Sequence, residues 1–193
     1  MATYMKKILM AELAGSNVLA KATAGRTALR KLLEVTEVEP DDPAPAVLDF
    51  KGIDAATSSF LRECVLGYRD GTRARRSNFY PVISNADEGV EEELNYLLSG
   101  RNEAMLACDL SSRNKVTRLH LLGELDPKHR QTFDLVMRIG ETDAGTLMRD
   151  YGGDEAVTRT AWNNRLAALS GMGLVIEVSH GRAKRYTPVL QET

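Results

Sequence analysis

The sequence has little cysteine or histidine, and neither is spaced as a metal or disulfide site requires. Its 193 residues include two cysteines, Cys64 and Cys108, and three histidines that lie far apart in the chain. The cysteines show no CxxC spacing, which argues against a disulfide framework and a zinc site. We therefore expect two buried thiols, no bound metal, and a reducing compartment such as the cytoplasm.

Sequence signatures of phosphate binding and catalysis are also missing. Neither GxGxxG nor GxxxxGK[ST] occurs in the chain, so no nucleotide loop is predicted. Asp49 ends an apolar run, a common place for an active-site carboxylate in α/β folds. No base or nucleophile accompanies it in a recognisable motif, and we expect Asp49 to order its loop instead. The sequence predicts no catalytic residues, no cofactor and no enzymatic activity.

Long hydrophobic runs are absent as well. No segment approaches the roughly 20 apolar residues that a membrane helix needs, so no membrane association is expected. The N-terminal stretch MATYMKKILMAELAG is too short in its apolar part for a signal peptide, and we expect residues 6–13 to form a first strand. A hydrophobic content of 43% allows a sizeable core, in one large domain or two small ones.

Charge is divided unevenly along the chain. Residues 1–126 carry 16 Lys and Arg against 19 Asp and Glu, whereas residues 156–193 carry five against two. A basic C-terminal end is what nucleic-acid binding requires. The excess is small, so we expect tight binding to need a dimer or a second contact.

Residues 1–123 alternate between strand and helix patterns. Short apolar runs predict strands at 46–50, 79–85, 104–110 and 116–122, the last two joined by the hairpin loop 111–115. Helical periodicity predicts helices from a Ser16 cap to Leu33, with an undecided break at Gly25, and over 56–70 and 90–100. Residues 39–46 and the basic segment 71–78 are expected to be loops. This order implies an α/β domain with a mostly parallel sheet.

Residues 124–193 predict three helices followed by a β-hairpin. Asp126 and Pro127 form a helix start, Thr142 is expected to cap the second helix, and Asp154 the third, over residues 155–169. Apolar residues at i, i+4 and i+7 give the third helix one buried stripe: Trp162, Leu166 and Leu169. Glycines 171 and 173 end it, and Gly181 turns a hairpin between LVIEV and AKRYTPV.

This C-terminal stretch resembles the recognition helix and wing of a winged helix-turn-helix domain, an α+β fold common in bacterial transcription regulators. The likeness lies in Arg165, Leu166, Leu169 and the GLV of residues 173–175, followed by a wing that contains Gly181. It implies a cytoplasmic regulator that binds double-stranded DNA as a homodimer, because two half-sites require two copies. The expected DNA contacts are Arg159, Thr160, Asn163, Asn164 and Arg165 in the helix, and Arg182, Lys184 and Arg185 in the wing.

The segment VLDFKGIDAATSSF resembles the central motif of STAS domains, the anti-sigma-factor antagonist family. There, a VLDL strand precedes Asp-Ser-Ser-Gly at a helix start, and the first serine is phosphorylated. In this chain VLDF precedes Thr57, Ser58, Ser59 and Phe60, which would place the phosphorylation site at Ser58. Because Thr57 and Phe60 replace the family's Asp and Gly, helix capping by Thr57 or Ser58 is the competing interpretation. The resemblance implies a module that senses, dimerises or binds a protein partner.

Two other functions remain open at this point. Winged helices also dock proteins, so the chain could be a protein-interaction module of a partner-switching system with no DNA binding. Alternatively, the segments 49–54 and 85–88 could line a small-ligand site at the ends of neighbouring strands. Salt-dependent retention on random DNA would separate the first alternative from a DNA-binding regulator.

Overall fold

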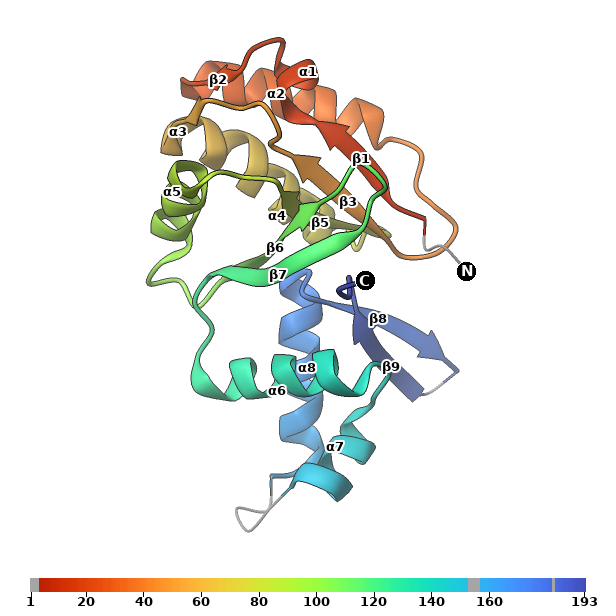
Figure 1. Cartoon of the computed structure of the whole chain (residues 1–193). Coiled ribbons are helices and arrows are strands. Elements are labelled where there is room, and N and C mark those ends of the chain that lie inside the picture. The colour runs from red at the N-terminus through yellow and green to blue at the C-terminus, as the bar shows by residue number, and fades with distance from the viewer. Residues whose placement is uncertain (1–3, 153–156, 182) are drawn as a thin grey trace. The chain divides into compact units, whose positions relative to one another are not determined.

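The chain folds into two compact units, as the computed structural model shows for residues 4–152, 157–181 and 183–193 (Figure 1). Unit 1 comprises Met1–Glu124 with Glu192–Thr193, and unit 2 comprises Leu125–Gln191. The boundary predicted after residue 123 lies beside this division. No sequence pattern indicated that the last two residues belong with unit 1, where Thr193 N–H donates to the carbonyl of Val116 at 3.0 Å.

Unit 1 is built on a five-stranded sheet that is mostly parallel. Its strand order is β1 (Lys6–Leu9), β3 (Ala44–Asp49), β5 (Phe79–Ser84), β6 (Ala104–Leu110) and β7 (Val116–Gly123). The first four strands pair in parallel, and β7 is antiparallel to β6. The predicted α/β class and the hairpin through residues 111–115 are confirmed.

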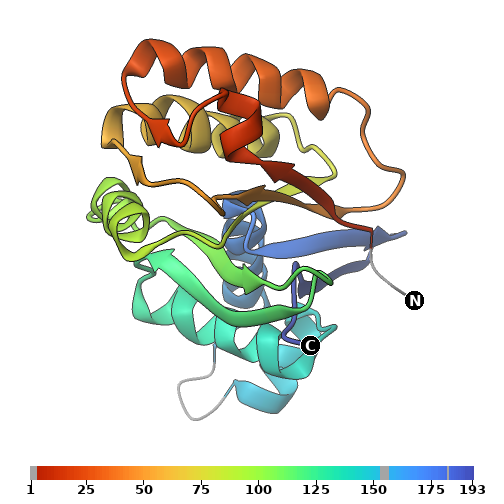
Figure 2. The same ribbon diagram turned by 45° about the horizontal axis from the view of Figure 1, so that its top comes forward.

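The helices of unit 1 pack on one face of this sheet. Neighbouring strands follow the chain order, so right-handed crossovers bring the connecting helices to the same side, as Figures 1 and 2 show. They are α1 (Met10–Ala14), α2 (Ala22–Val35), α3 (Ser58–Leu61), a π-helical turn η1 (Arg62–Leu66), α4 (Gly67–Ala74) and α5 (Glu88–Leu98). The core between sheet and helices includes the buried side chains of Leu32, Leu48, Phe60, Leu61, Ile83 and Leu94.

The first predicted elements need correction. The strand expected over residues 6–13 ends at Leu9, and α1 follows it directly, ending at Gly15 with φ of 69°. Ser16 caps no helix, because its hydroxyl bonds the backbone of Val18 two residues on. Residues Val18–Leu19 form the short strand β2, which pairs with β4 (Ala55–Ala56).

Helix α2 is continuous through Gly25. A Cβ at this position would lie 2.8 Å from the carbonyl oxygen of Phe60 and 3.0 Å from Cβ of Glu63. The glycine therefore serves the close approach of two helices rather than a break. The loop predicted for residues 71–78 is also partly helical, since α4 continues to Ala74 with the buried Thr72 hydroxyl bonded to carbonyls one turn back.

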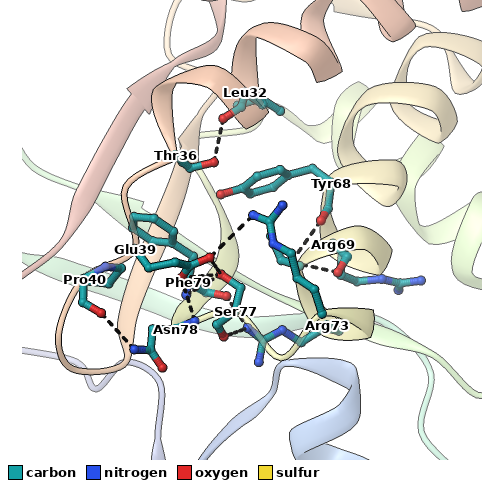
Figure 3. Close-up of polar contacts among 12 residues, drawn as sticks. Leu32, Thr36, Glu39, Pro40, Tyr68, Arg69, Arg73, Ser77, Asn78 and Phe79 are labelled. Carbon is teal, nitrogen blue, oxygen red and sulfur yellow. Dashed lines mark hydrogen bonds and ion pairs between the residues drawn. The ribbon is translucent and has the colours of Figure 1, made fainter.

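A polar network closes the sheet at the amino ends of β3 and β5 (Figure 3). The Glu39 carboxylate accepts hydrogen bonds from the Ser77 hydroxyl at 2.7 Å and from the Asn78 N–H at 2.9 Å. The Asn78 amide donates to the carbonyl of Pro40 at 2.8 Å. The Arg73 guanidinium lies 3.9 Å from the centroid of the Tyr80 ring. These contacts hold the Pro- and Asp-rich loop before β3 against the start of β5.

Unit 2 contains three helices and a two-stranded hairpin. They are α6 (Pro127–Ile139), α7 (Ala144–Tyr151), α8 (Arg159–Met172), β8 (Val175–His180) and β9 (Ala183–Pro188). Asp126 caps α6 as predicted, accepting from the N–H of Lys128 at 2.9 Å. The cap of α7 is Asp143 rather than Thr142, and its carboxylate accepts from Gly145 N–H at 2.7 Å.

Thr142 has a different role in unit 2. Its backbone N–H and carbonyl pair with those of Tyr186 at 3.0 and 2.8 Å. The segment between α6 and α7 therefore joins the edge of the hairpin next to β9. This pairing satisfies the backbone of a buried residue that could not otherwise reach water.

Helix α8 begins later than the sequence suggested. The expected cap Asp154 and start Glu155 lie outside the described residues, and the helix itself starts at Arg159. Thr158 is its N-cap, accepting from the Ala161 N–H at 3.2 Å. At the other end Gly173, with φ of 82°, terminates the helix as expected, whereas Gly171 lies inside it.

Two helical glycines of unit 1, Gly25 in α2 and Gly71 in α4, give a matched test of the close approach at Gly25. We expect Gly25→Ala to destabilise unit 1 by about 1–3 kcal/mol because the added methyl overpacks the contact with Phe60. Gly71→Ala, in α4, adds a methyl that meets nothing within 4 Å, and should stabilise by about 0.5–1 kcal/mol through helix propensity. Urea unfolding followed by far-UV circular dichroism measures both. Equal effects of the two variants would contradict the close approach.

Candidate functional site

Helix α8 presents an uncharged polar face to solvent. Trp162, Leu166 and Leu169 are fully buried, as their spacing predicted. Thr160, Asn163, Asn164 and Ala167 are exposed. Their spacing of i, i+3, i+4 and i+7 places these four on one side of the helix, opposite the buried stripe. Three of the predicted DNA contacts are thus gathered on a single accessible surface.

The two arginines of α8 are placed differently from this face. The Arg165 guanidinium lies 4.8 Å from the centroid of the Trp162 ring, and its side chain is half-buried. Arg159 is exposed and lies near the start of α7, where a Cβ on Gly145 would be 3.9 Å from its guanidinium carbon. Hydrogen bonding from Thr146 N–H lowers the pKa of Asp143, and the charge of Arg159 adds a weaker lowering effect.

The two hairpin cations that the structure describes, Lys184 and Arg185, are paired within unit 2. The Lys184 ammonium lies 2.7 Å from Oε1 of Glu177. Arg185 forms an ion pair with Glu141, which lies just after α6. Arg182, the third cation predicted in this region, lies outside the described residues. Each basic contact predicted for the hairpin and described in the structure therefore has a carboxylate partner.

These acidic partners were missed by the sequence reasoning, and one of them had a detectable signal. In the hairpin register Glu177 is opposite Tyr186, which puts Lys184 diagonally across from it, within reach of a long side chain. Glu141 had no such signal, because its pairing with Arg185 depends on how α6 lies against the hairpin.

In unit 1, Ser58 lies in the first turn of α3 and is half-buried. Thr57 is the N-cap of that helix, and its hydroxyl accepts from the Phe60 N–H at 3.4 Å. The capping interpretation is thus confirmed for Thr57. A groove between this turn and α5 is lined by Asp54, Ser58, Asp87, Glu92, Glu93 and Tyr96, among others. A phosphate on Ser58 would face these carboxylates, and like-charge repulsion opposes it.

Asp49 is buried at the carboxyl end of β3, with a donor on each side. Its Oδ2 lies 2.8 Å from the ammonium of Lys7. Its Oδ1 accepts from the Asn85 amide at 2.8 Å and from the Lys51 N–H at 3.0 Å. Asn85 in turn accepts from Leu110 N–H at 2.8 Å, so the cluster ties together β1, β3, β5 and β6.

The environment of Asp49 keeps it charged. Burial by itself would raise the pKa of Asp49, but hydrogen bonds from Lys7, Asn85 and the Lys51 backbone hold it below its ordinary value of 3.8. A low pKa makes a carboxylate a poor proton acceptor. The contacts fit the expected loop-ordering role. The sequence placed Asn85 near Asp49 at the ends of neighbouring strands, but it did not reveal Lys7, which parallel pairing brings in from a distant segment.

The part of the chain that the structure describes contains neither a metal-site cluster nor an exposed cysteine. Within the described ranges, no three His, Cys, Asp or Glu side chains are grouped as a metal site requires. Cys64 and Cys108 are buried free thiols, and burial raises the pKa of each to about 12. Of the helices in the described part of the chain, none is long and apolar enough to cross a bilayer.

Comparisons with protein-family models, with curated proteins and with solved structures found no match to this chain. The functions of the candidate sites are therefore inferred from their geometry and chemistry alone.

The Asp49 cluster predicts a pH-dependent contribution to stability. Because its folded pKa is lowered, Asp49 stabilises the fold above its unfolded pKa, and that contribution is lost as pH falls through the folded pKa. We expect Asp49→Asn to cost about 1.5–3 kcal/mol at pH 7, as for the loss of hydrogen bonds to a charged group, with the gap from the unmodified protein shrinking below about pH 4. Urea unfolding at several pH values measures this. Asp134→Asn, which breaks an exposed pair with Arg130, should cost less than about 1 kcal/mol.

The cysteines give a simple test of burial. With a pKa near 12, a thiol is almost entirely protonated at pH 8, and the thiolate is the reactive form. We expect neither Cys64 nor Cys108 to react with a disulfide reagent such as DTNB in the folded protein, and both to react in denaturant. Rapid labelling of one thiol without unfolding would show that its side chain is accessible.

Proposed function

We propose that the protein is a DNA-binding transcriptional regulator and that unit 2 is a winged helix-turn-helix domain, with α8 as recognition helix and β8–β9 as wing. The observation that carries this proposal is the exposed polar face of α8, whose side-chain types bond base edges, set opposite a fully buried apolar stripe. Three helices followed by a hairpin, with the Thr142 segment paired to its edge, support the same reading.

The chemistry of this surface suits the major groove. An α-helix fits that groove, and hydrogen-bonding side chains on the inserted face read the base edges. Thr160, Asn163 and Asn164 supply such groups, and Arg159 in the first turn supplies a phosphate contact. Lys184 and Arg185 would hold the DNA backbone, but each must exchange a carboxylate for a phosphate. We therefore expect modest affinity for one copy and a homodimer on two half-sites.

For unit 1 we propose a STAS-like module that dimerises or binds a protein partner in the cytoplasm. The acidic groove of Asp54, Asp87, Glu92 and Glu93 beside Ser58 suits a basic segment of that partner by charge complementarity. The same carboxylates make phosphorylation of Ser58 the less favoured mode of control.

A second function is supported by the internal ion pairs of the hairpin. If Lys184 and Arg185 keep their carboxylate partners, the surface of unit 2 is better suited to a protein than to DNA. The chain would then be a protein-interaction module of a partner-switching system. Salt dependence separates the two, because only DNA binding releases condensed counterions.

The ion pair between Arg185 and Glu141 gives a paired test of DNA binding. We expect Arg185→Ala to weaken binding to every duplex and to reduce the slope of log affinity against log salt by about 1. Glu141→Gln frees Arg185 and should strengthen binding to every duplex. Fluorescence anisotropy with random duplexes and with DNA upstream of the protein's own gene, at two salt concentrations, measures both.

The control for this test is Arg101→Ala, an exposed arginine of unit 1 whose nearest carboxylate is 3.9 Å away. It should leave DNA binding unchanged. Absence of any binding at low salt by the unmodified protein would contradict the DNA-binding proposal and favour a protein partner.

A further inference from the structure

We infer that the DNA half-site read by α8 is built from A·T base pairs, with adenines at adjacent positions contacted by Asn163 and Asn164. This inference rests on the proposed DNA binding and specifies its target. It follows from which side chains of α8 face solvent and which are already engaged.

The side chains available on the exposed stripe are Thr160, Asn163, Asn164 and Ala167. None of the four is charged. Asparagine side chains present a donor and an acceptor together, which match N6 and N7 of adenine in the major groove. The methyl groups of Thr160 and Ala167 match the C5-methyl of thymine. Each of the four side chains thus has a group that fits one of the two bases of an A·T pair, and the Thr160 hydroxyl, which can bond any base, does not discriminate.

The side chains that read guanine are placed elsewhere. Bidentate contact to O6 and N7 of guanine is made by arginine or lysine. Arg165 packs over the Trp162 ring and has one guanidinium nitrogen buried. Moving this guanidinium to a base would expose Trp162, the largest buried side chain of the helix. Arg159 lies beside the first turn of α7, near the Asp143 carboxylate. From that position it is placed for the DNA backbone rather than for the centre of the stripe.

The two asparagines have no evident part in stabilising α8. Their side chains form no hydrogen bond with the residues that the structure describes, although bonds of this kind are resolved for Asn78, Asn85 and Asn95. Asparagine is also a weaker helix former than alanine. Two adjacent, exposed asparagines in the middle of a helix therefore lower the stability of that helix and gain no hydrogen bond from the described residues. Hydrogen bonds to a partner outside the chain explain why they are present.

The test is selection of binding sites from a random duplex library by the full chain, followed by anisotropy on the selected duplex. We expect adjacent A·T pairs in each selected half-site. Asn163→Ala and Asn164→Ala should each weaken binding to that duplex by about 10-fold or more, while weak binding to random DNA is retained. Replacing the selected adenines with 7-deazaadenine, which lacks the N7 acceptor, should give a similar loss.

Gln131→Ala is the matched control, since it removes an exposed amide from α6. It should bind the selected duplex as the unmodified protein does. Thermal melting checks that the variants are folded, and substitution of an exposed helical asparagine by alanine should not lower the melting temperature. Selection of G·C pairs, or full binding by both asparagine variants, would overturn the inference and leave DNA binding standing. Absence of all binding at low salt would overturn both.

Discussion

Burial of the Trp162, Leu166 and Leu169 stripe determines what α8 offers to a partner. Removing three large apolar side chains from water stabilises unit 2 by several kcal/mol, about 1.5–3 kcal/mol for each aliphatic side chain. A helix has only one rotation that buries all three, so the same event turns Thr160, Asn163 and Asn164 toward solvent. It also brings Arg165 onto the Trp162 ring. The proposed reading surface is thus a consequence of core packing.

Charged and uncharged side chains of the proposed interface would make different kinds of contact with DNA. The uncharged stripe of α8 suits base edges, whereas Arg159 and the hairpin cations suit phosphates. Lys184 and Arg185 already have carboxylate partners, so part of the electrostatic gain on DNA is offset by breaking these pairs. Exposed ion pairs of this kind are individually weak. Exchanging a carboxylate partner for a phosphate therefore costs little free energy. The resulting surface has a modest attraction for DNA of any sequence, so specific base contacts can make a large difference to affinity.

In unit 1 the carboxyl edge of the sheet depends on a single buried charge. Asp49 gathers donors from Lys7, Asn85 and the Lys51 backbone, which joins neighbouring parallel strands at the end where their connections diverge. Sequence reasoning found Asp49 and its ordering role and placed Asn85 at the neighbouring strand end, but it did not find Lys7. The same limit applied to Gly25, where the sequence left undecided whether there is one helix or two. The structure shows one continuous helix, in which the glycine admits the carbonyl of Phe60.

Local patterns in the sequence were enough to determine the alternation of strands and helices in unit 1, the capped start of α6 at Asp126 and the buried stripe of α8. Each depends on periodicity or on a cap within a few residues. Tertiary structure decided the rest: α1 following β1 directly, Asp143 rather than Thr142 capping α7, the Thr142 pairing with Tyr186, and the ion pair of Arg185 with Glu141. These features depend on contacts between residues far apart in the chain, whose free energies outweigh weak local preferences and leave no periodic trace in the sequence.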